Sequence, residues 1–269
     1  MSKNNVKPFR FESFGARIAI TGNRQDMIDR AAAIARSSLL GKVSEIIDDN
    51  VDRTIEVNFD GTTYEMICEG SEPARGEDEV VFFKYFDSIV RASVGEEARD
   101  FVFLHAGVVG WNGKAIVLPG DSYKGKSTLV AELVRAGAEY YSDDFALFNS
   151  DGLLYPFHRH LAMRRRDNFD PYSLTVEELE GKYGYEPIPT GLVLFTEYVK
   201  GSRFRPRRMS AGEGVLELVQ YALSMRQRSE FAFRVLNNIA SRAIIISSRR
   251  GTAETFAKTL LNFVDNHGN

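Results

Sequence analysis

The chain has 269 residues, of which 43% are hydrophobic and 26% are charged, and its net charge is −3. Such a composition is typical of a folded chain with a sizeable core, and the small net charge excludes a general attraction to nucleic acid or to an anionic membrane. The single cysteine, Cys68, cannot build a disulfide framework and is expected to be a small residue in a strand.

Targeting and membrane segments are not expected. The first residues, MSKNNVKPFRFE, lack the apolar core of a signal peptide, and no run approaches about 18 apolar residues. We therefore expect a cytoplasmic protein that has neither a membrane nor a nucleic acid as partner, and homo-oligomerisation is left open.

Residues 1–98 predict a small mixed α/β domain. Residues 9–21 alternate between apolar and polar side chains and are interrupted by Gly15, which predicts a strand with a bulge or two short strands. Helical spacing follows over 23–40, with Asn23 as the cap.

The rest of this first domain continues the mixed pattern. Residues 54–59 and 62–67 flank Asp60-Gly61, which predicts a hairpin with a type I′ turn. The polar segment 70–79 is expected to be an exposed loop, and 80–94 has the spacing of a helix.

A second domain is expected over residues 99–269. Apolar runs at 101–109 and 114–118 flank Trp111-Asn112-Gly113, which indicates another hairpin. Residues 127–136 have the apolar spacing of a helix that ends at Gly137. Further along, the pattern predicts an irregular polar segment at 164–184, strands at 191–197 and 243–247, and helices at 214–225, 230–240 and 252–264.

The most informative motif is GDSYKGKST at residues 120–128, which satisfies G-x-x-x-x-G-K-[S/T]. In such a loop the backbone N–H groups wrap a phosphate chain, the lysine reaches the terminal phosphates and the next hydroxyl binds Mg²⁺. The alternative is a glycine turn without a ligand. The context of strand, loop and helix N-terminus favours a phosphate site. Its expected residues are Gly120, Asp121, Ser122, Tyr123, Lys124, Gly125, Lys126, Ser127 and Thr128.

Two aspartates, Asp143 and Asp144, follow the predicted loop-helix unit at the end of the next strand. A P-loop protein places its Mg²⁺-associated acid at such a strand end, and a second acid could accept a proton from an attacking hydroxyl. Consecutive strand residues face opposite sides, so both acids reach one site only if the strand ends at Asp143. The alternative is a solvated Asp-Asp turn.

Other polar residues give weaker signals. His105 lies in an apolar strand, where a hydrogen-bonded core histidine is the common alternative to a functional one. His158 and His160 form a His-x-His pair for which no third metal ligand is visible. The arginines that follow are either phosphate contacts or part of a solvated face; they are Arg164, Arg165 and Arg166.

These motifs together resemble the kinase domain of HPr kinase/phosphorylase, and more closely the broader group of HPr-kinase-related proteins. The resemblance runs through HAGVV at 105–109, LPGDSYKGKS at 118–127 and the Ser142-Asp143-Asp144 segment. It implies an α/β fold in which the P-loop is embedded in a domain akin to phosphoenolpyruvate carboxykinase, behind a small mixed α/β N-terminal domain. It also implies that His105 lies at the active site, that Asp143 is the base and that Asp144 is the metal-associated acid.

The chain departs from this family at several points. Tyr123-Lys124 replaces a glycine and a small aliphatic residue, and Thr128 replaces a glutamate. The glycine-rich segment that accompanies HPr recognition and phosphorylase activity is not recognisable after Arg164, and the N-terminal residues do not resemble the regulatory domain. A kinase is therefore expected rather than a bifunctional kinase/phosphorylase.

We thus expect an ATP- and Mg²⁺-dependent phosphotransferase that acts on a hydroxyl, most simply a serine of a protein or peptide. The expected catalytic residues are Asp143, His105 and Lys126, and the expected metal ligands are Ser127 and Asp144. A small-molecule kinase, a non-catalytic nucleotide-binding regulatory module and a degenerate scaffold are the alternatives. A basic rim for an acidic peptide is expected from 164–184 together with Arg203, Arg205, Arg207 and Arg208.

Overall fold

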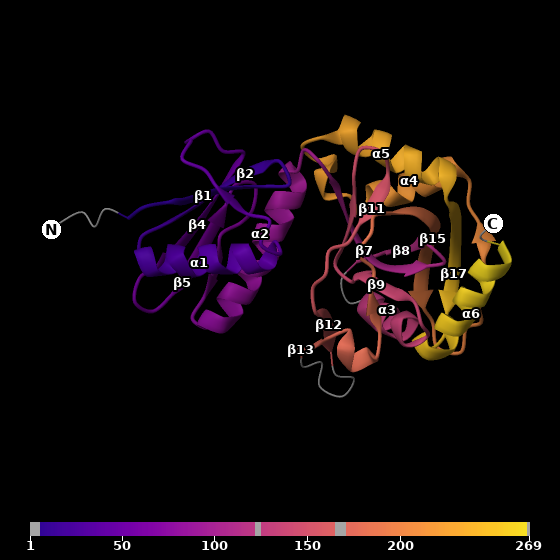
Figure 1. Cartoon of the computed structure of the whole chain (residues 1–269). Helices are drawn as coiled ribbons and strands as arrows, with labels where there is room; N and C mark the ends of the chain where they lie inside the picture. The colour runs from indigo at the N-terminus through magenta and orange to yellow at the C-terminus, as the bar shows by residue number, and fades with distance from the viewer. Residues whose placement is uncertain (1–5, 122–124, 165–170, 268–269) are drawn as a thin grey trace. The chain divides into compact units, whose positions relative to one another are not determined.

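The computed structural model describes residues 6–121, 125–164 and 171–267, and the chain divides into two compact units, Met1–Asp100 and Phe101–Asn269. Both units combine helices with sheets, so the fold is mixed α/β (Figure 1). The boundary expected from the sequence, residue 98, is the C-cap of the last helix in the first unit. Within the described ranges, no helix has the length and apolar content needed to cross a bilayer.

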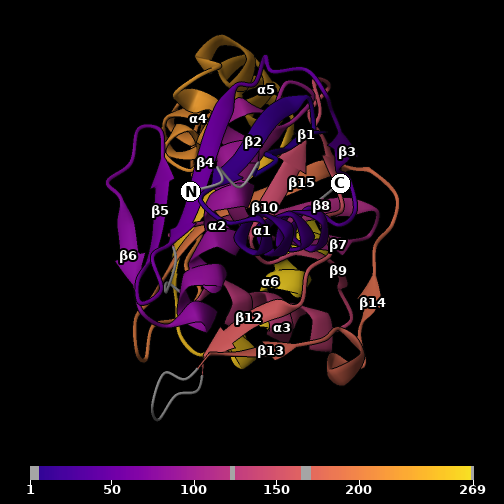
Figure 2. The ribbon, with the colours of Figure 1, turned by 90° about the vertical axis from the view of Figure 1, so that its left-hand side faces the viewer.

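The first unit is a six-stranded sheet whose strand order is β3-β1-β2-β4-β5-β6. Figure 2 looks onto this unit and shows β3 and β6 at opposite edges of the sheet. Helices α1 and α2 contact each other and both contact β2, so they cover the same face. The elements are β1 Phe9–Ser13, β2 Ala16–Gly22, α1 Gln25–Ser38, β3 Ser44–Glu45, β4 Arg53–Phe59, β5 Tyr64–Cys68, β6 Ala74–Gly76 and α2 Glu79–Glu97.

Most of the predicted elements of this unit are present. The interruption at Gly15 separates two antiparallel strands, and Cys68 is buried at the end of β5. Two predictions were wrong. The turn between β4 and β5 is longer than a two-residue type I′ turn: Gly61 has a positive φ but Asp60 does not, and the Asp60 carboxylate accepts from the amides of Thr62 and Thr63. The segment 70–79 also contains β6 rather than only loop.

The second unit is built on a nine-stranded sheet with helices on both faces. Its first part contains β7 Val102–Trp111, β8 Lys114–Pro119, α3 Lys126–Arg135, β9 Glu139–Ser142, β10 Phe145–Phe148, β11 Leu153–Tyr155, β12 Leu161–Arg164, β13 Pro171–Leu174, η1 Glu177–Leu179 and β14 Lys182–Tyr183. Its second part contains β15 Ile188–Tyr198, β16 Arg207–Arg208, α4 Ala211–Val219, η2 Leu223–Met225, α5 Ser229–Arg242, β17 Ile244–Arg250 and α6 Ala253–His267.

The β7–β8 hairpin was predicted correctly, because Asn112 and Gly113 both have positive φ and connect Trp111 directly to Lys114. The predicted strands and helices after residue 190 are also present, although α4 ends at Val219 and a short 3₁₀ turn replaces its last part. The segment 164–184 was predicted to be irregular, but its described part contains β13, η1 and β14.

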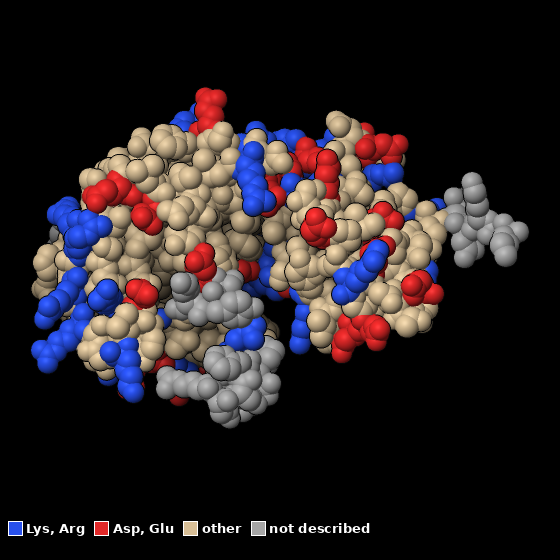
Figure 3. Space-filling view, turned by 180° about the vertical axis from the view of Figure 1, so that it is seen from behind, with Lys and Arg blue, Asp and Glu red and all other residues tan. Residues whose placement is uncertain are grey.

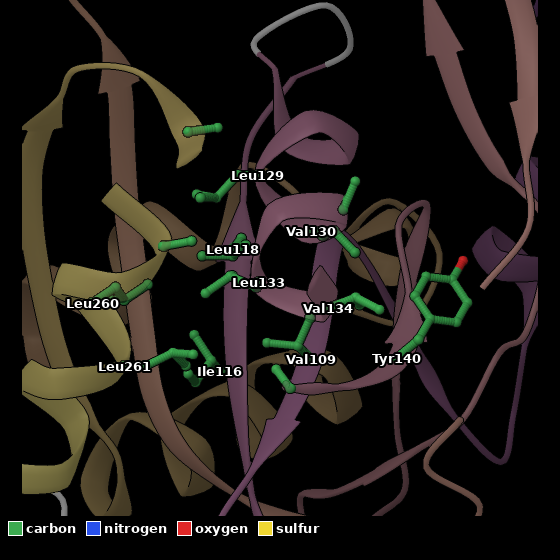
Figure 4. Packing of buried hydrophobic residues seen from close by; sticks show 14 of the residues in the cluster. Val109, Ile116, Leu118, Leu129, Val130, Leu133, Val134, Tyr140, Leu260 and Leu261 are labelled. Carbon is green, nitrogen blue, oxygen red and sulfur yellow. The ribbon is translucent and has the colours of Figure 1, made fainter. Parts of the chain in front are cut away.

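Strand β8 carries the sheet into the P-loop and is buried on both faces. Ile116 and Leu118 pack in the core beneath α3 and α6 (Figure 4). Ala115 and Val117 pack on the opposite face, in the core beneath α4 and α5. This explains why residues 114–118 form a continuous apolar run without alternation.

Strands β8, β15 and β17 are mutually parallel neighbours, with β15 between the other two. Their carboxyl ends, at Pro119, Tyr198 and Arg250, therefore meet at one edge of the sheet. In open α/β sheets this edge is where ligands bind.

Candidate functional site

The phosphate-binding motif occupies the connection between β8 and α3, as the sequence predicted. Gly125 is the N-cap of α3 and has a φ of +78°, a conformation that favours glycine. A Cβ atom at this position would lie 2.6 Å from Nη2 of Arg250. Gly120 and Asp121 are described, and Ser127 and Thr128 lie half-buried in the first turn of α3. Ser122, Tyr123 and Lys124, which were predicted to contact nucleotide, lie outside the described residues.

Lys126 is the first residue of α3, and its ammonium lies among several acceptors. Nζ donates to the carbonyl oxygens of Gly120 at 2.6 Å and Asp121 at 2.8 Å, and it lies 3.1 Å from Nε2 of His105. Burial lowers the pKa of Lys126 to about 8, although the nearby carboxylates of Asp144, Asp121 and Asp143 oppose that shift. The Lys126 ammonium, at the start of α3, therefore loses its proton at a lower pH than an ordinary lysine does.

The two aspartates lie in the tight connection between β9, which ends at Ser142, and β10, which begins at Phe145. The Ser142 hydroxyl accepts from the amides of Asp144 and Phe145 and so fixes this turn. Because the strand ends before the pair, both carboxylates lie close enough to attract the Lys126 ammonium. The strand ends at Ser142, one residue before the end at Asp143 that the sequence analysis required, so both aspartates lie in the connection.

Asp143 is buried, with 5% of its surface exposed. Its Oδ2 accepts from the backbone N–H of Ala162 at 2.9 Å, and its Oδ1 accepts from the hydroxyl of Tyr140 at 3.2 Å. Burial raises the pKa of Asp143, and these donors partly offset the rise. The same burial, together with Asp143, raises the pKa of Tyr140 well above its usual value.

His105 lies on β7, directly opposite Phe145 of β10. Its pKa is lowered by burial and by the neighbouring Lys126 ammonium, so the neutral ring is favoured. Nε2 of the ring faces Nζ of Lys126, and Nδ1 lies 3.8 Å from Oδ1 of Asp144. His105 therefore lies between the P-loop lysine and Asp144, the half-buried member of the acid pair.

A cavity of about 500 Å³ lies beside the P-loop at the edge where β8, β15 and β17 end. It is lined by Gly120, Asp121, Gly125 and Lys126 from the P-loop region, and by Phe195, Glu197, Glu217 and Tyr221 among other residues. Four arginines also line it; they are Arg205, Arg207, Arg249 and Arg250. In Figure 3, Lys and Arg side chains gather at the end of the second unit that is on the left of the view.

Arg250 was missed by the sequence reading. Arg250 is buried, with 4% of its surface exposed. Its Nη2 donates to the carbonyl oxygen of Gly125 at 3.1 Å, which ties the end of β17 to the end of the P-loop. Burial lowers the pKa of Arg250 below its usual value. A signal was present in the sequence, because an arginine at the carboxyl end of a strand parallel to β8 must lie near the P-loop.

The other predicted basic residues separate into two groups. Arg205 and Arg207 line the cavity, and Arg207 also pairs with Glu213 at 2.9 Å. Arg203 and Arg208 are exposed outside the described cavity lining, Arg164 lies on β12, and Arg165 and Arg166 lie outside the described residues.

Of the His-x-His pair, His158 borders this site through Tyr140, whose hydroxyl donates to Asp143, and no contact among the described residues joins His160 to it. His158 lies 2.8 Å from the carbonyl oxygen of Gly184 and packs against Tyr140, Tyr183 and Tyr185, whereas His160 is exposed. Over the part of the chain that the structure describes, no group of three or more His, Cys, Asp or Glu side chains could hold a metal by itself.

The comparisons with known proteins yield a weak structural likeness and no match in sequence. No protein-family model matches the chain, and no curated protein matches it in sequence. Among solved structures, the chain is similar to the Hpr(Ser) kinase/phosphatase from Coxiella burnetii, with a TM-score of 0.34 and 13% sequence identity over 61% of this chain and 95% of that one. Such a weak likeness does not establish a family, and the functional assignment rests on the geometry of the site.

Proposed function

We propose that this chain is an ATP- and Mg²⁺-dependent kinase that transfers a phosphoryl group to a hydroxyl of a protein or peptide. The observation that carries the proposal is the convergence of Lys126, His105 and the Asp143-Asp144 pair at a strand-loop-helix phosphate motif, next to a cavity. A phosphate motif alone would fit any nucleotide-binding module, but a module that only binds has no need for a second acid.

The donor phosphates would bind at the N-terminus of α3. The first-turn N–H groups have no helical partners and the helix dipole favours negative charge there. Lys126 would exchange the carbonyl oxygens of Gly120 and Asp121 for phosphate oxygens, and the arginines of the cavity would add positive charge toward the rest of the donor.

The oxygen donors present fit Mg²⁺. This ion is usually held by one or two carboxylates together with substrate phosphates, so a site with no cluster of three protein acids is suitable. Ser127 and the acid pair would supply the protein oxygens. When bound, Mg²⁺ would neutralise negative charge on the phosphates.

Two observations favour a peptide or protein as the acceptor over a small molecule. Arg205, Arg207 and Arg249 are exposed around the mouth of the cavity, where they suit an acidic partner. Asp144, the half-buried member of the acid pair, lies outside the cavity lining, so an acceptor could approach it beside the cavity rather than within it. A small-molecule kinase and a nucleotide-binding regulatory module are the alternatives.

Labelling tests the proposal directly. The chain is incubated with γ-labelled ATP, Mg²⁺ and a cell lysate or candidate proteins, and Lys126→Met serves as the inactive control. We expect labelled protein or peptide with the phosphate on a hydroxyl. Label transferred to a sugar or nucleoside alone would support the small-molecule alternative, and nucleotide binding without any transfer would support the regulatory module.

Nucleotide binding is also expected to take up a proton at alkaline pH. With a pKa of about 8, Lys126 is roughly three-quarters neutral at about pH 8.5 and mostly charged at about pH 7 in the free protein. Donor phosphates, which are ionised at both pH values, would raise the pKa of Lys126 and restore its proton. Calorimetry in buffers of different ionisation enthalpy should show uptake of about 0.7 proton at pH 8.5 and about 0.1 at pH 7.

The control for this measurement is Lys126→Arg, which keeps the charge but does not titrate in this range. If it binds nucleotide, its binding should take up no proton at the higher pH. Uptake that is equal at both pH values in the unaltered protein would contradict the role assigned to Lys126.

A further inference from the structure

The cavity beside the P-loop extends away from the acid pair. Strand β8 lies between β7 and β15, and β15 lies between β8 and β17. The cavity crosses the ends of β15 and β17, where it is lined by Phe195, Ser247 and Ser248. The acid pair follows β9, which pairs with the other edge of β7. The cavity and the acid pair therefore lie on opposite sides of the strand that leads into the P-loop.

The cavity wall opposite these strands comes from α4, which crosses the sheet from β17 to β7. Two residues before this helix begins, the amide of Met209 donates to the carbonyl oxygen of Ile245 in β17 at 2.9 Å. Two residues after it ends, the carbonyl oxygen of Tyr221 accepts from the amide of His105 in β7 at 2.8 Å. Tyr221 therefore lines the part of the cavity near the P-loop, and Glu217, one turn earlier, lines a part nearer β17.

The dimensions of the cavity suit a nucleoside attached to the donor phosphates. Its volume of about 500 Å³ lies within the range of about 300–1,000 Å³ that small-molecule sites occupy. Neighbouring strands are about 4.8 Å apart, so the two steps from β8 to β17 span about 10 Å. In an in-line transfer the leaving group and the attacking hydroxyl lie on opposite sides of the phosphorus. A nucleoside in this cavity leaves the side of the acid pair to the acceptor.

Glu217 has the position and the acceptor capacity to bind a ribose. It is half-buried in α4, and its Oε2 accepts from Nε2 of Gln220 at 3.4 Å, which is longer than an ordinary hydrogen bond of about 2.9 Å. The carboxylate can therefore accept further hydrogen bonds. Carboxylates repel phosphates but accept from hydroxyls, and an acid binds the ribose hydroxyl in dinucleotide sites. The ribose is also the part of a nucleotide that follows the phosphates.

The cavity also offers planar side chains to a base. The rings of Phe195 and Tyr221 lie with their centroids 6.4 Å apart and their planes at 30°, and Arg249 lines the cavity at the end of β17. Aromatic rings and guanidinium groups both stack on the face of a base, and such stacking accepts any base. The ribose contact is therefore the selective one.

We propose that this cavity binds the nucleoside of the phosphoryl donor and that Glu217 accepts hydrogen bonds from its ribose hydroxyls. This proposal rests on the proposed kinase function and specifies its donor. The donor is a ribonucleotide, rather than a deoxynucleotide or an inorganic polyphosphate, and the acceptor uses the other side of the P-loop, where Asp144 lies.

Three ligands test the proposal, because they separate the phosphates from the ribose hydroxyls and from the rest of the nucleoside. They are pyrophosphate, ADP and 2′,3′-dideoxy-ADP, each with Mg²⁺. Calorimetry measures the affinity of each ligand for the unaltered chain, for Glu217→Ala and for Glu217→Gln. The matched control is Asp151→Asn, which removes the same charge from an exposed position in the turn between β10 and β11. The ratio of the affinities for ADP and dideoxy-ADP cancels the general effect of charge on the phosphates.

The unaltered chain is expected to bind ADP about 10- to 100-fold more tightly than dideoxy-ADP, because hydrogen bonds to a charged acceptor are the stronger kind. It should bind ADP at least about 10-fold more tightly than pyrophosphate, since the ribose contact alone provides that much. In Glu217→Ala the affinities for ADP and dideoxy-ADP should agree within about twofold, because the acceptor is gone. Glu217→Gln keeps an acceptor oxygen without the charge and should show a smaller ratio than the unaltered chain. Asp151→Asn should keep the full ratio, and neither Glu217 variant should bind pyrophosphate less tightly.

An unchanged ratio in Glu217→Ala would overturn the role of Glu217. Equal affinities for ADP and pyrophosphate in the unaltered chain would overturn the nucleoside site, while the phosphate site of the proposed kinase would still stand. Failure of all three ligands to bind with Mg²⁺ would instead remove the proposed kinase function itself.

Discussion

Lys126→Met is expected to lose Mg·ATP binding by about 100-fold or more while the chain remains folded. The ammonium makes three close contacts, two of them to carbonyl oxygens of the loop that would wrap the phosphates. A charge-assisted contact with a phosphate is roughly twice as strong as a neutral one. Lys126 is the first residue of α3, so the substitution removes this contact from the start of the helix. Methionine keeps the apolar stem and removes only the charge and the donors.

Thermal unfolding measures this effect without an acceptor. A ligand that binds the folded state alone stabilises it by about 2.7 kcal/mol at a concentration of about 100 times its Kd, so Mg·ATP should raise the Tm of the unaltered protein. The same addition should leave the Tm of Lys126→Met almost unchanged. Lys258→Met, at an exposed position on α6, is the matched control and should respond like the unaltered chain. An equal Tm shift in the Lys126 and Lys258 variants would contradict the assignment.

Much of this site could be predicted because its signals are local. The nine-residue motif and its flanks lie within 114–136, where a run buried on both faces predicted β8 and a helical apolar face predicted α3. The acid pair could be placed for the same reason, since β9 follows α3 directly. Local sequence specifies local geometry well when one short segment contains strand, turn and helix.

The difference between the two aspartates could not be predicted, because distant residues cause it. Ala162 donates to Asp143 from 19 positions further along the chain, and Tyr140 is fixed in turn by the carbonyl oxygen of Arg159. No pattern in Ser142-Asp143-Asp144 shows which carboxylate will be enclosed. Arg250, which contacts Gly125 from 125 positions further along the chain, escaped notice for the same reason.

The turn after β4 shows that even a two-residue motif does not fix the type of turn. Asp60-Gly61 suggested a two-residue turn, yet the carboxylate of Asp60 accepts from the amides of Thr62 and Thr63 and stabilises a longer one. An aspartate at a turn can bond to its own following backbone, and this option competes with the tight hairpin.

Gly125→Ala is expected to lower the affinity for nucleotide by at least about 10-fold. This loss is larger than the backbone strain of an alanine at this position would cause by itself. Gly125 has a φ of +78°, and the added Cβ would lie 2.6 Å from Nη2 of Arg250. That nitrogen donates to the carbonyl oxygen of Gly125 itself, which also accepts from the amide of Leu129 in the first turn of α3. Relief of the contact must therefore move a buried guanidinium, the end of the P-loop or both, and each movement disturbs the N–H groups that would face the phosphates.

Gly113→Ala provides a close control for the strain. Gly113 has a φ of +72°, it lies in the β7–β8 turn of the same unit, and a Cβ there would have no atom within 4 Å. Both substitutions should lower the free energy of unfolding by about 1–2 kcal/mol, the cost of the left-handed conformation for a residue with a side chain. Only Gly125→Ala should also lose affinity for Mg·ADP, measured by calorimetry under identical conditions.

Combining Gly125→Ala with Arg250→Met identifies the cause of the lost affinity. In an Arg250→Met background the nitrogen that the new methyl group would meet is gone, so adding Gly125→Ala should cost less affinity than it does in the unaltered chain. Such a difference between the two backgrounds measures the coupling of neighbouring residues directly. If Gly125→Ala lowers the affinity equally in both backgrounds, the guanidinium does not constrain the P-loop. If Gly113→Ala loses affinity as strongly as Gly125→Ala, global destabilisation rather than the loop explains the result. The expected pattern requires β17 to hold the phosphate loop through Arg250, a contact that joins two segments 125 residues apart.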